Sequence, residues 1–534
     1  MSNAFRRILL AAALSGFIAL SWEIMWARLY NFATGSRATA FGAMLGSYLL
    51  GLALGSLWSM KWHHDEDHFS LRSLGRLILG SALLAFLVVP LASWIVTLKN
   101  PDDCWIYLGW FETSICLPPW SWTLPLVALA AALQGTTLPL MCHVAIPADE
   151  KAGSRLSYVY LANIIGSGAG SLLTGFWLME MLPLRGIAAL LAVLTLVLVT
   201  IFGLKPLLSD GISRLLAVVL IVFAALTTQF HNGIWDRLFW KHEIAEKVPF
   251  PVVMESRHGI ITIDKDRKVY GNGAYDGEIN TSLTFGDYHV RPYFISAVHP
   301  GPLKRVLVIG MSAGAWTQII ANHPDQPDVD VVEISHGYID IIAAYPQVSS
   351  LLKNPRVKIN IDDGRRWLKR QPDRKFDCIL MNTTHHWREF ASGLLSQEFL
   401  QLANQHLAPD GVVMWNCTDS PRAAKTGMQV FPYTLMCLNN CIASNKPLEP
   451  NQARWREVLS IYKIDGKPVF DLTTEAGKTE LEKVLKLTEN DMDPPTSETP
   501  DRWWIVKQER MHKLWDNATP ITDDNLGHEY PAKE

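Results

Sequence analysis

Seven long apolar runs in the first half of the chain constrain its fold more than any other feature. Each is long enough, or nearly so, to cross the ~30 Å hydrocarbon core of a bilayer as a helix. Seven such runs in succession are rare in soluble proteins, so the sequence predicts an α-helical transmembrane bundle. The last run is short and carries Arg214 at its edge. The expected helices are Ile8–Tyr30, Ala38–Met60, Leu77–Leu98, Pro125–Ile146, Leu156–Leu182, Ile187–Leu204 and Ile212–Phe230.

Two of these runs place glycines three or four residues apart. They read GSYLLGLALGS, from Gly46 to Ser56, and NIIGSGAGSLLTG, from Asn163 to Gly175. Such spacing lets helix backbones approach closely in lipid. It predicts tight packing within one bundle, with a dimer interface as the alternative. Polar groups in or near these runs are functional candidates or interhelical hydrogen-bonding groups: Glu23, His143, Asn163 and Glu180.

The orientation follows from Lys and Arg in the short loops, which mark cytoplasmic ends. One set of ends carries Arg6, Arg7, Lys61, Arg72, Arg76, Lys151, Arg155, Lys205 and Arg214, whereas the opposite loops carry only Arg37, Lys99 and Arg185. Seven crossings from a cytoplasmic N-terminus would put the C-terminal part outside, and one crossing fewer would keep it in the cytosol. We expect a multi-pass membrane protein.

The seven cysteines raise two questions of pairing. Cys104 and Cys116 share a loop that the charge rule places outside, where they could form a disulfide, whereas in a reducing compartment they would stay free. Cys437 and Cys441, in CLNNC, pose the same question. The spacings match no zinc signature, and we expect no metal.

From about Trp235 the composition becomes that of an ordinary globular protein. Residues 253–280 alternate polar and apolar positions with turn signals, which predicts a small antiparallel β region. Buried strands and helices then alternate, as in a parallel sheet covered on both faces, and indicate an α/β Rossmann-like domain. The expected parts are a transmembrane domain (1–232), a linker with the β region (233–300), the Rossmann domain (301–485) and a polar tail (486–534).

The ends of three successive strands suggest a ligand. The first strand ends at Gly310, where a backbone can approach a ligand, and the second ends at Glu333, where an acid commonly binds ribose hydroxyls. Asp363, after the third, could accept from an adenine amine. NAD is the competing ligand, but its pyrophosphate needs three glycines and GMSAGA has only Gly310 and Gly314. An adenosyl compound without phosphates needs less room, and the net charge of -3 does not suggest nucleic acid.

From about Glu255 to Cys417 the chain resembles the spermidine synthase (polyamine aminopropyltransferase) family. The carrying segments are YGNGAYDGEIN, DYHVRPYFISAVHPGPLKRVLVIG, VVEI, IDDGRRWL and FDCILMN, in family order. SGFIALSWEIMWARLY, GTTLPLM and YLANIIGSGAGSLLTGFWLM resemble the membrane half of bacterial fused synthases, and ITDDNLGHEY resembles their tails.

On the adenosyl side, the resemblance implies largely kept positions. Glu333 matches the ribose acid, Asp363 and Gly364 match the pair that contacts adenine, and Asn280 replaces a glutamine. These positions imply S-adenosylmethionine or a related adenosyl compound as cofactor.

On the amine side, the resemblance implies lost acids. Ala313 stands where the family's glycine loop has an aspartate that holds the aminopropyl ammonium, and Asn382 stands at the catalytic aspartate. Tyr288 and His289 fall where a Tyr-Gln pair faces the amine substrate. Further along, His385 and His386 could act as bases near neutral pH or be exposed loop residues.

Three functions follow as alternatives. The first is an enzyme that uses an adenosyl cofactor for another alkyl transfer, a cyclisation or an elimination. The second is a polyamine aminopropyltransferase with displaced catalytic groups, and the third is an inactive binding or assembly module. The partners expected are the adenosyl ligand, the lipid bilayer and a second copy or another membrane protein, without nucleic acid.

Overall fold

The computed structural model describes residues 3–61, 71–98, 118–202, 209–283, 289–382, 388, 391–418, 420–489 and 505–526, and the backbone of 105–108 and 113–116. It divides into an N-terminal unit, Met1–Thr262, and a C-terminal unit, Ile263–Glu534.

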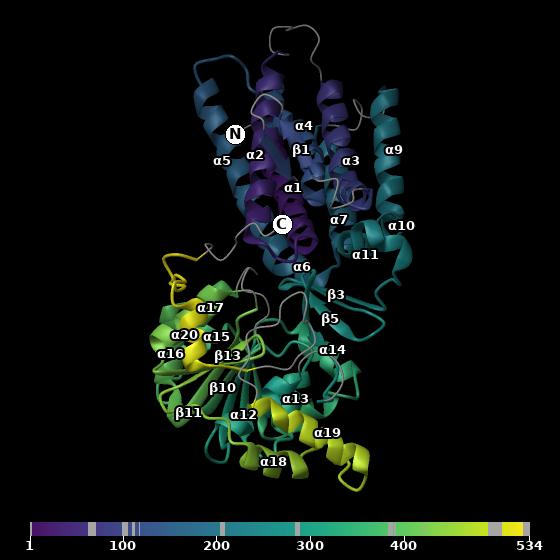
Figure 1. Cartoon of the computed structure of the whole chain (residues 1–534). Coiled ribbons are helices and arrows are strands. Elements are labelled where there is room, and N and C mark those ends of the chain that lie inside the picture. The colour runs from purple at the N-terminus through teal and green to yellow at the C-terminus, as the bar shows by residue number, and fades with distance from the viewer. Residues whose placement is uncertain are drawn as a thin grey trace. The chain divides into compact units, whose positions relative to one another are not determined.

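The N-terminal unit is a bundle of long helices (Figure 1). Six of its described helical segments are long and apolar enough to cross a membrane, in agreement with the first six expected helices. The long helices are α1 (Asn3–Ala33), α2 (Ala38–Ser59), α3 (Leu71–Ile95), α4 (Leu124–Ala145), α5 (Ala152–Leu173) and α7 (Leu184–Ile201). Shorter elements are β1 (Trp105–Leu108), β2 (Thr113–Cys116), η3 (Pro119–Thr123), η4 (Thr174–Leu178) and α6 (Met179–Met181).

The seventh expected helix is broken. Helix α9 (Gly211–Ala225) is separated from the segment Thr227–Glu246 by a bend of 72°. That segment comprises α10 (Thr227–Phe230), α11 (Ile234–Trp240) and η5 (Lys241–Glu246). The Thr227 hydroxyl donates back to the carbonyls of Phe223 and Ala224, at 3.1 and 2.5 Å. The helix stops at Leu226, whose φ of -96° and ψ of 19° lie outside the α-helical region. Hydroxyl bonding of this kind competes with the backbone ladder next to the break.

The broken segment nevertheless runs the length of its neighbour α3. Asp210, the N-cap of α9, accepts from Arg76 near the start of α3 at 2.8 Å. Arg237 in α11 donates to Ser93 near the end of α3 at 3.0 Å. Arg76 and Ser93 lie about 25 Å apart along the helix, at 1.5 Å per residue. The chain therefore passes from one end of the bundle to the other between residues 210 and 237.

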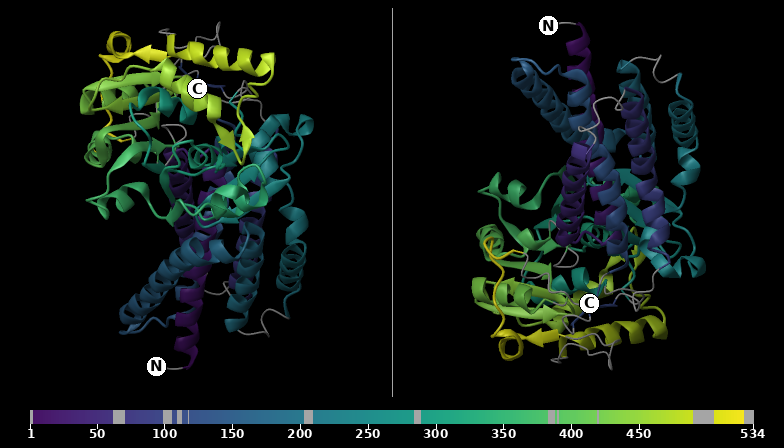
Figure 2. Two further views of the ribbon diagram at one scale, coloured as in Figure 1. Left: turned by 90° about the horizontal axis from the view of Figure 1, so that it is seen from below. Right: turned by 90° about the horizontal axis from the view of Figure 1, so that it is seen from above.

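Two helix pairs are held together by glycines. A Cβ at Gly166 or Gly170 of α5 would collide with carbonyl oxygens of α1, and one at Gly51 or Gly55 of α2 would collide with those of α4. Asn163 adds an interhelical hydrogen bond to the Ala12 carbonyl, at 3.1 Å. These glycines thus serve packing within the bundle, the first of the two expected roles. Figure 2 shows the purple α1 lying among the blue helices.

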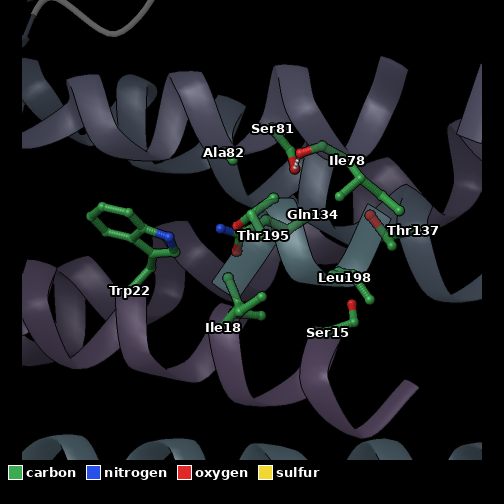
Figure 3. A pocket seen from close by; sticks show the side chains of 11 residues that line it. Ser15, Ile18, Trp22, Ile78, Ser81, Ala82, Gln134, Thr137, Thr195 and Leu198 are labelled. Atoms are coloured by element: carbon green, nitrogen blue, oxygen red, sulfur yellow. Dashed lines mark hydrogen bonds between the residues drawn. The ribbon is translucent and has the colours of Figure 1, made fainter. Parts of the chain in front are cut away.

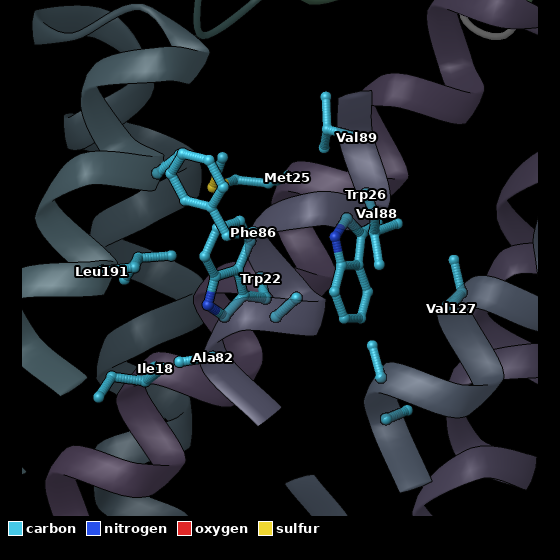
Figure 4. Packing of buried hydrophobic residues seen from close by; sticks show 14 of the residues in the cluster. Ile18, Trp22, Met25, Trp26, Ala82, Phe86, Val88, Val89, Val127 and Leu191 are labelled. Carbon is cyan, nitrogen blue, oxygen red and sulfur yellow. The ribbon is translucent and has the colours of Figure 1, made fainter. Parts of the chain in front are cut away.

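The bundle core is aromatic at its centre. Trp22 and Trp26 stack at 6.2 Å between ring centroids, and Phe86 of α3 lies in the same buried cluster (Figure 4). Among the other polar candidates, Glu23 is buried at 8% exposure, whereas His143 is exposed. Glu180 accepts from the backbone N–H of Arg257, at 3.1 Å, and lies at an ion-pair distance from that residue.

The cysteine predictions have separate outcomes. Cys104 lies outside the described residues, as does the side chain of Cys116, so their pairing stays a prediction. Cys437 and Cys441 are both free thiols, and both are fully buried.

A four-stranded sheet of order β3-β4-β5-β6 forms the predicted small β region. Its strands are β3 (Val252–Ser256), β4 (Gly259–Ile263), β5 (Lys268–Gly271) and β6 (Ala274–Glu278), and the division between the units falls inside β4. In the N-terminal unit, Glu255 of β3 accepts from the Leu184 N–H that opens α7, at 2.7 Å, and from the Trp235 indole at 3.1 Å. This carboxylate thereby caps a helix that has no side-chain N-cap of its own.

The C-terminal unit contains a mixed sheet of order β16-β12-β13-β11-β10-β7-β8-β9 (Figure 1). The five predicted strands β7 (Arg305–Ile309), β8 (Asp328–Glu333), β9 (Val357–Ile361), β10 (Phe376–Met381) and β11 (Leu407–Asn416) are parallel, with β7 at the centre. The antiparallel β13 (Asn440–Ser444) lies between β11 and β12 (Tyr433–Cys437). This order is that of a Rossmann-like fold of the methyltransferase type.

Helices and short elements connect these strands. They are α12 (Val290–Val298), α13 (Ala315–Ala321), α14 (Gly337–Ala344), η6 (Ser349–Lys353), α15 (Gly364–Lys369), η7 (Ser392–Leu394), α16 (Gln397–Gln405), α17 (Pro421–Val430), α18 (Gln452–Ile461), β14 (Lys463–Ile464), β15 (Lys467–Pro468), α19 (Glu475–Leu485) and η8 (Lys486–Glu489).

The segment expected as a polar tail, 486–534, contributes to the sheet instead. Its strand β16 (Ile505–Lys507) pairs antiparallel with β12, and its helix α20 (Gln508–Trp515) follows directly. Ile505 and Val506 are fully buried, as are Met511 and Ile521 further along, so apolar residues dock the described part of this segment.

Candidate functional site

The candidate site lies where four parallel strands of the C-terminal unit end. Gly310 directly follows β7, Glu333 ends β8, and Asn382 directly follows β10. Asp363 follows β9 after Asp362. Because parallel strands end at one edge of a sheet, these four residues come to the edge at which such folds bind ligands.

The glycine loop, Gly310–Gly314, turns sharply between β7 and α13. Gly310 and Gly314 have φ of 84° and 77°, a region that favours glycine. A Cβ at Gly310 would lie 2.9 Å from the carbonyl oxygen of Asn382. Ser312 also has positive φ, at 47°. The loop is therefore held close to the end of β10, and it retains two glycines because its backbone requires them.

The β5–β6 hairpin covers this loop. The Ser312 hydroxyl donates to the carbonyl oxygen of Asp276 in β6. A Cβ at Gly277 would lie 3.2 Å from the Ser312 hydroxyl and 3.6 Å from the Ala313 Cβ. Ala313, where the resemblance implies a lost aspartate, is buried at 3% exposure beneath the hairpin.

The Glu333 side chain fixes the glycine loop by hydrogen bonds to backbone N–H groups. Its two carboxylate oxygens accept from the N–H groups of Met311, at 2.7 Å, and Ser335, at 2.9 Å. Burial raises the pKa of Glu333 to about 7, although these backbone N–H groups act in the opposite direction. The predicted ribose acid therefore also has a structural role that sequence reasoning missed.

Asp363 and Gly364 form the start of α15. The Asp363 carboxylate accepts from the Arg366 N–H at 2.8 Å, as an N-cap. A Cβ at Gly364 would lie 2.7 Å from the Ile309 side chain, so glycine lets α15 begin against the end of β7. Contact with adenine stays a prediction for both residues.

The two asparagines of the predicted site make local contacts. The Asn280 side chain accepts from the Ser282 N–H at 2.9 Å, closing a turn after β6. The Asn382 backbone N–H donates to the Ile309 carbonyl at 2.9 Å, which fixes the end of β10 beside that of β7. Asn382 thus lies at the edge where the resemblance implies a catalytic acid.

Three predicted residues lie outside the described residues: Tyr288, His385 and His386. Their roles remain predictions from the resemblance. His289, the neighbour of Tyr288, is described and is buried at 3% exposure.

A buried polar cluster beside the loop was not predicted. Asp276 forms an ion pair of 2.8 Å with Arg388, which also donates to the Gly271 carbonyl at 3.0 Å. The Tyr338 hydroxyl donates to the second oxygen of Asp276. Burial raises the pKa of Tyr338 well above its usual value, so the hydroxyl keeps its proton. The only signal for this cluster was the YDG motif that contains Asp276.

The side chains at the strand ends can be compared with the groups that ligands and metal ions require. Among the described residues no group of three or more His, Cys, Asp or Glu side chains could hold a metal ion. The edge instead offers the buried carboxylate of Glu333 and the helix-capping carboxylate of Asp363, and carboxylates accept hydrogen bonds from hydroxyls and amines.

Comparison with known proteins places the similarity in this unit. Residues 295–430 match the spermine/spermidine synthase domain model. A polyamine aminopropyltransferase of Agathobacter rectalis is 31% identical over 147 residues, covering 27% of this chain and 50% of that protein. Polyamine aminopropyltransferase of Streptococcus uberis is 33% identical over 120 residues, covering 22% of this chain and 41% of that protein. The chain thus spans half or less of these two relatives, and its C-terminal part carries a spermidine synthase-like domain.

Solved structures are similar over a comparable part. The spermidine synthase of Thermotoga maritima has a TM-score of 0.32 and 21% identity, covering 39% of this chain and 83% of that one. A spermidine synthase in complex with the transition-state analogue AdoDATO has a TM-score of 0.33 and 20% identity, covering 39% and 84%. Human methyltransferase-like protein 13 in complex with SAH has a TM-score of 0.24 and 17% identity, covering 40% and 92%.

Proposed function

We propose that the C-terminal unit binds an adenosyl compound of the S-adenosylmethionine type and catalyses a transfer reaction related to that of polyamine aminopropyltransferases. The observation that carries this proposal is the set Gly310, Glu333 and Asp363 at the ends of three adjacent strands. The match over residues 295–430 includes all three positions. In this proposal Glu333 accepts from the ribose hydroxyls with the lone pairs that the loop leaves free.

The reaction differs from ordinary spermidine synthesis in this proposal, because the amine-holding acids are replaced. Ala313 and Asn382 carry no charge, so they cannot neutralise an aminopropyl ammonium. The acids that the described residues bring to the loop are already engaged, Asp276 by Arg388 and Glu333 by backbone N–H groups. An unpaired ammonium in a closed pocket costs several kcal/mol. A ligand that keeps its carboxylate suits this site better than a decarboxylated one.

The test measures turnover by the purified full chain. With decarboxylated S-adenosylmethionine and putrescine we expect less than about 1% of the ~10 per second that is typical of enzymes. The double variant Ala313→Asp/Asn382→Asp restores both acids and is expected to raise that rate. Wild-type turnover near ~10 per second would refute the altered chemistry and leave an ordinary aminopropyltransferase.

For the N-terminal unit, we propose seven crossings of a bacterial inner membrane, with the C-terminal unit on the face opposite Asn3. The support is the passage of residues 210–237 along the whole of α3, together with the Lys/Arg asymmetry. Seven crossings place the two termini on opposite sides, and the basic ends favour a cytoplasmic N-terminus. The adenosyl ligand would then have to reach the non-cytoplasmic side.

Paired C-terminal fusions test this topology. A phosphatase that is active only outside the cytosol should give signal, and a fluorescent protein that folds only in the cytosol should stay dark. The opposite pattern would mean an even number of crossings, or a reversed orientation, and would put the site where adenosyl cofactors are made.

A further inference from the structure

A small cavity lies between four helices of the N-terminal unit. It measures about 30 Å³ and is lined by residues of α1, α3, α4 and α7 (Figure 3). Apolar Ile, Leu and Ala side chains make up part of its lining. Six residues of the lining carry hydrogen-bonding atoms: Ser15, Trp22, Ser81, Gln134, Thr137 and Thr195.

Two of these polar side chains have an atom without a partner among the residues that the structure describes. Trp22 is 1% exposed, and its indole Nε1–H has no acceptor within the described part of the chain. The Oε1 of Gln134 is also buried and has no donor among the residues whose positions are described. One is a donor and the other an acceptor, and both belong to the lining of the same cavity. Buried polar groups in native proteins are nearly always satisfied, so an unmatched pair around a void points to an occupant.

The hydroxyls of the lining add acceptors. Ser81 donates to the Ile78 carbonyl at 2.9 Å, and Thr195 donates to the Leu191 carbonyl at 2.8 Å. Their hydrogens are thus used within their own helices, and their oxygens are left to accept. The cavity therefore presents one donor, the Trp22 Nε1–H, and several acceptor oxygens. These groups suit a bound molecule that donates more hydrogen bonds to the protein than it accepts from it.

The size and charge of the cavity restrict this molecule further. No Asp, Glu, Lys, Arg or His side chain belongs to its lining, so an ammonium or carboxylate would remain unpaired. A buried water needs a cavity of roughly 10–15 Å³ and two to four polar partners. We propose that the bundle binds two water molecules here, which accept from Trp22 Nε1 and donate to Gln134 and the hydroxyl oxygens.

Matched Trp variants test the proposal in the full chain, by equilibrium unfolding in detergent micelles. Trp22→Phe removes the donor that faces the cavity. Trp26→Phe is the control, because Trp26 is fully buried one turn away and its Nε1 also has no described partner, but it does not line the cavity. We expect Trp22→Phe to lower the folding equilibrium constant about tenfold more than the control.

Gln134→Leu provides the second half of a cycle. It should also lower the folding equilibrium constant. The double variant Trp22→Phe/Gln134→Leu should lower that constant by less than the product of the two single effects, because each change releases the same waters. In a dry cavity both changes would remove unpaired polar atoms, so an unchanged or raised constant would overturn the proposal. A high-resolution density map of the wild-type chain gives an independent readout. Peaks within hydrogen-bond distance of both side chains support the proposal, and an empty cavity or a lipid chain there refutes it.

Discussion

The raised pKa of Glu333 predicts how ligand binding depends on pH. Ribose hydroxyls donate to a carboxylate, so the proposed adenosyl ligand prefers the ionised form of this side chain. Burial raises the pKa of Glu333 from 4.5 to about 7. At pH 6 only about one carboxyl in ten is ionised in the free protein, and the apparent affinity should fall about tenfold for each pH unit below 7.

The raised pKa of Glu333 also determines whether the free energy of unfolding rises or falls with pH. Below pH ~4.5 both the folded and the unfolded chain hold the proton, and Glu333 contributes no pH dependence. Between ~4.5 and ~7 the unfolded chain loses the proton while the folded chain keeps it, so the free energy of unfolding falls as pH rises. The loss is about 3 kcal/mol once the pH exceeds 7, from the pKa shift at about 1.4 kcal/mol per unit.

Titration calorimetry with methylthioadenosine from pH 5.5 to 8.5 tests the binding prediction. Glu333→Gln should weaken binding at pH 8 by at least about tenfold, since a hydrogen bond to a charged group contributes ~1.5–3 kcal/mol, and should flatten the pH profile. Glu457→Gln, on the exposed side of α18, is the control and should leave the profile unchanged. A wild-type affinity that stays flat across this range, or a steep profile that persists in Glu333→Gln, would refute the role of this carboxylate.

Three further predictions concern stability. Gly55→Ala should destabilise the full chain by ~1–3 kcal/mol in unfolding experiments, because its Cβ collides with α4, whereas Gly46→Ala on the open side of α2 should have little effect; equal effects would contradict the packing. Glu255→Ala should cost ~1–3 kcal/mol by freeing the Leu184 N–H, and exposed Glu246→Ala serves as its control in the same melts. Arg388→Met should cost ~3–5 kcal/mol by leaving Asp276 unpaired, and adding Asp276→Asn should recover part of that loss; no recovery would argue against the ion pair.

Much of the fold could be predicted because it depends on local apolar pattern. The long helices and the five parallel strands are continuous apolar segments, which one window of sequence reveals. The break after α9 falls at Leu226, which is itself apolar, so a hydropathy pattern does not register it. Strand β16 has three residues, and its burial comes from pairing with β12 some 70 residues earlier, so no local signal identifies it.

The places of Glu333 and Asp363 at strand ends could be predicted from the sequence, whereas their contacts could not. Glu333 and Asp363 were expected at strand ends because the succession of strands fixes where each one stops. Their hydrogen bonds to Met311 and Arg366 depend on how the following turns fold, which spacing does not determine. Asp276 and Arg388 are 112 residues apart in sequence, and only the folded hairpin brings them together.

The pairing of α1 with α5 has a consequence for the order of assembly during synthesis. Ala12 and its hydrogen-bonding partner Asn163 are separated by 151 residues. At 5–20 residues per second the ribosome needs roughly 8–30 s to reach the second after the first. During that interval, the side of α1 that later packs against the glycines of α5 must contact something other than α5. Nascent chains stalled before α5 should therefore hold this side of α1 in transient contacts, and the α1–α5 pair can form only after α2, α3 and α4 have emerged.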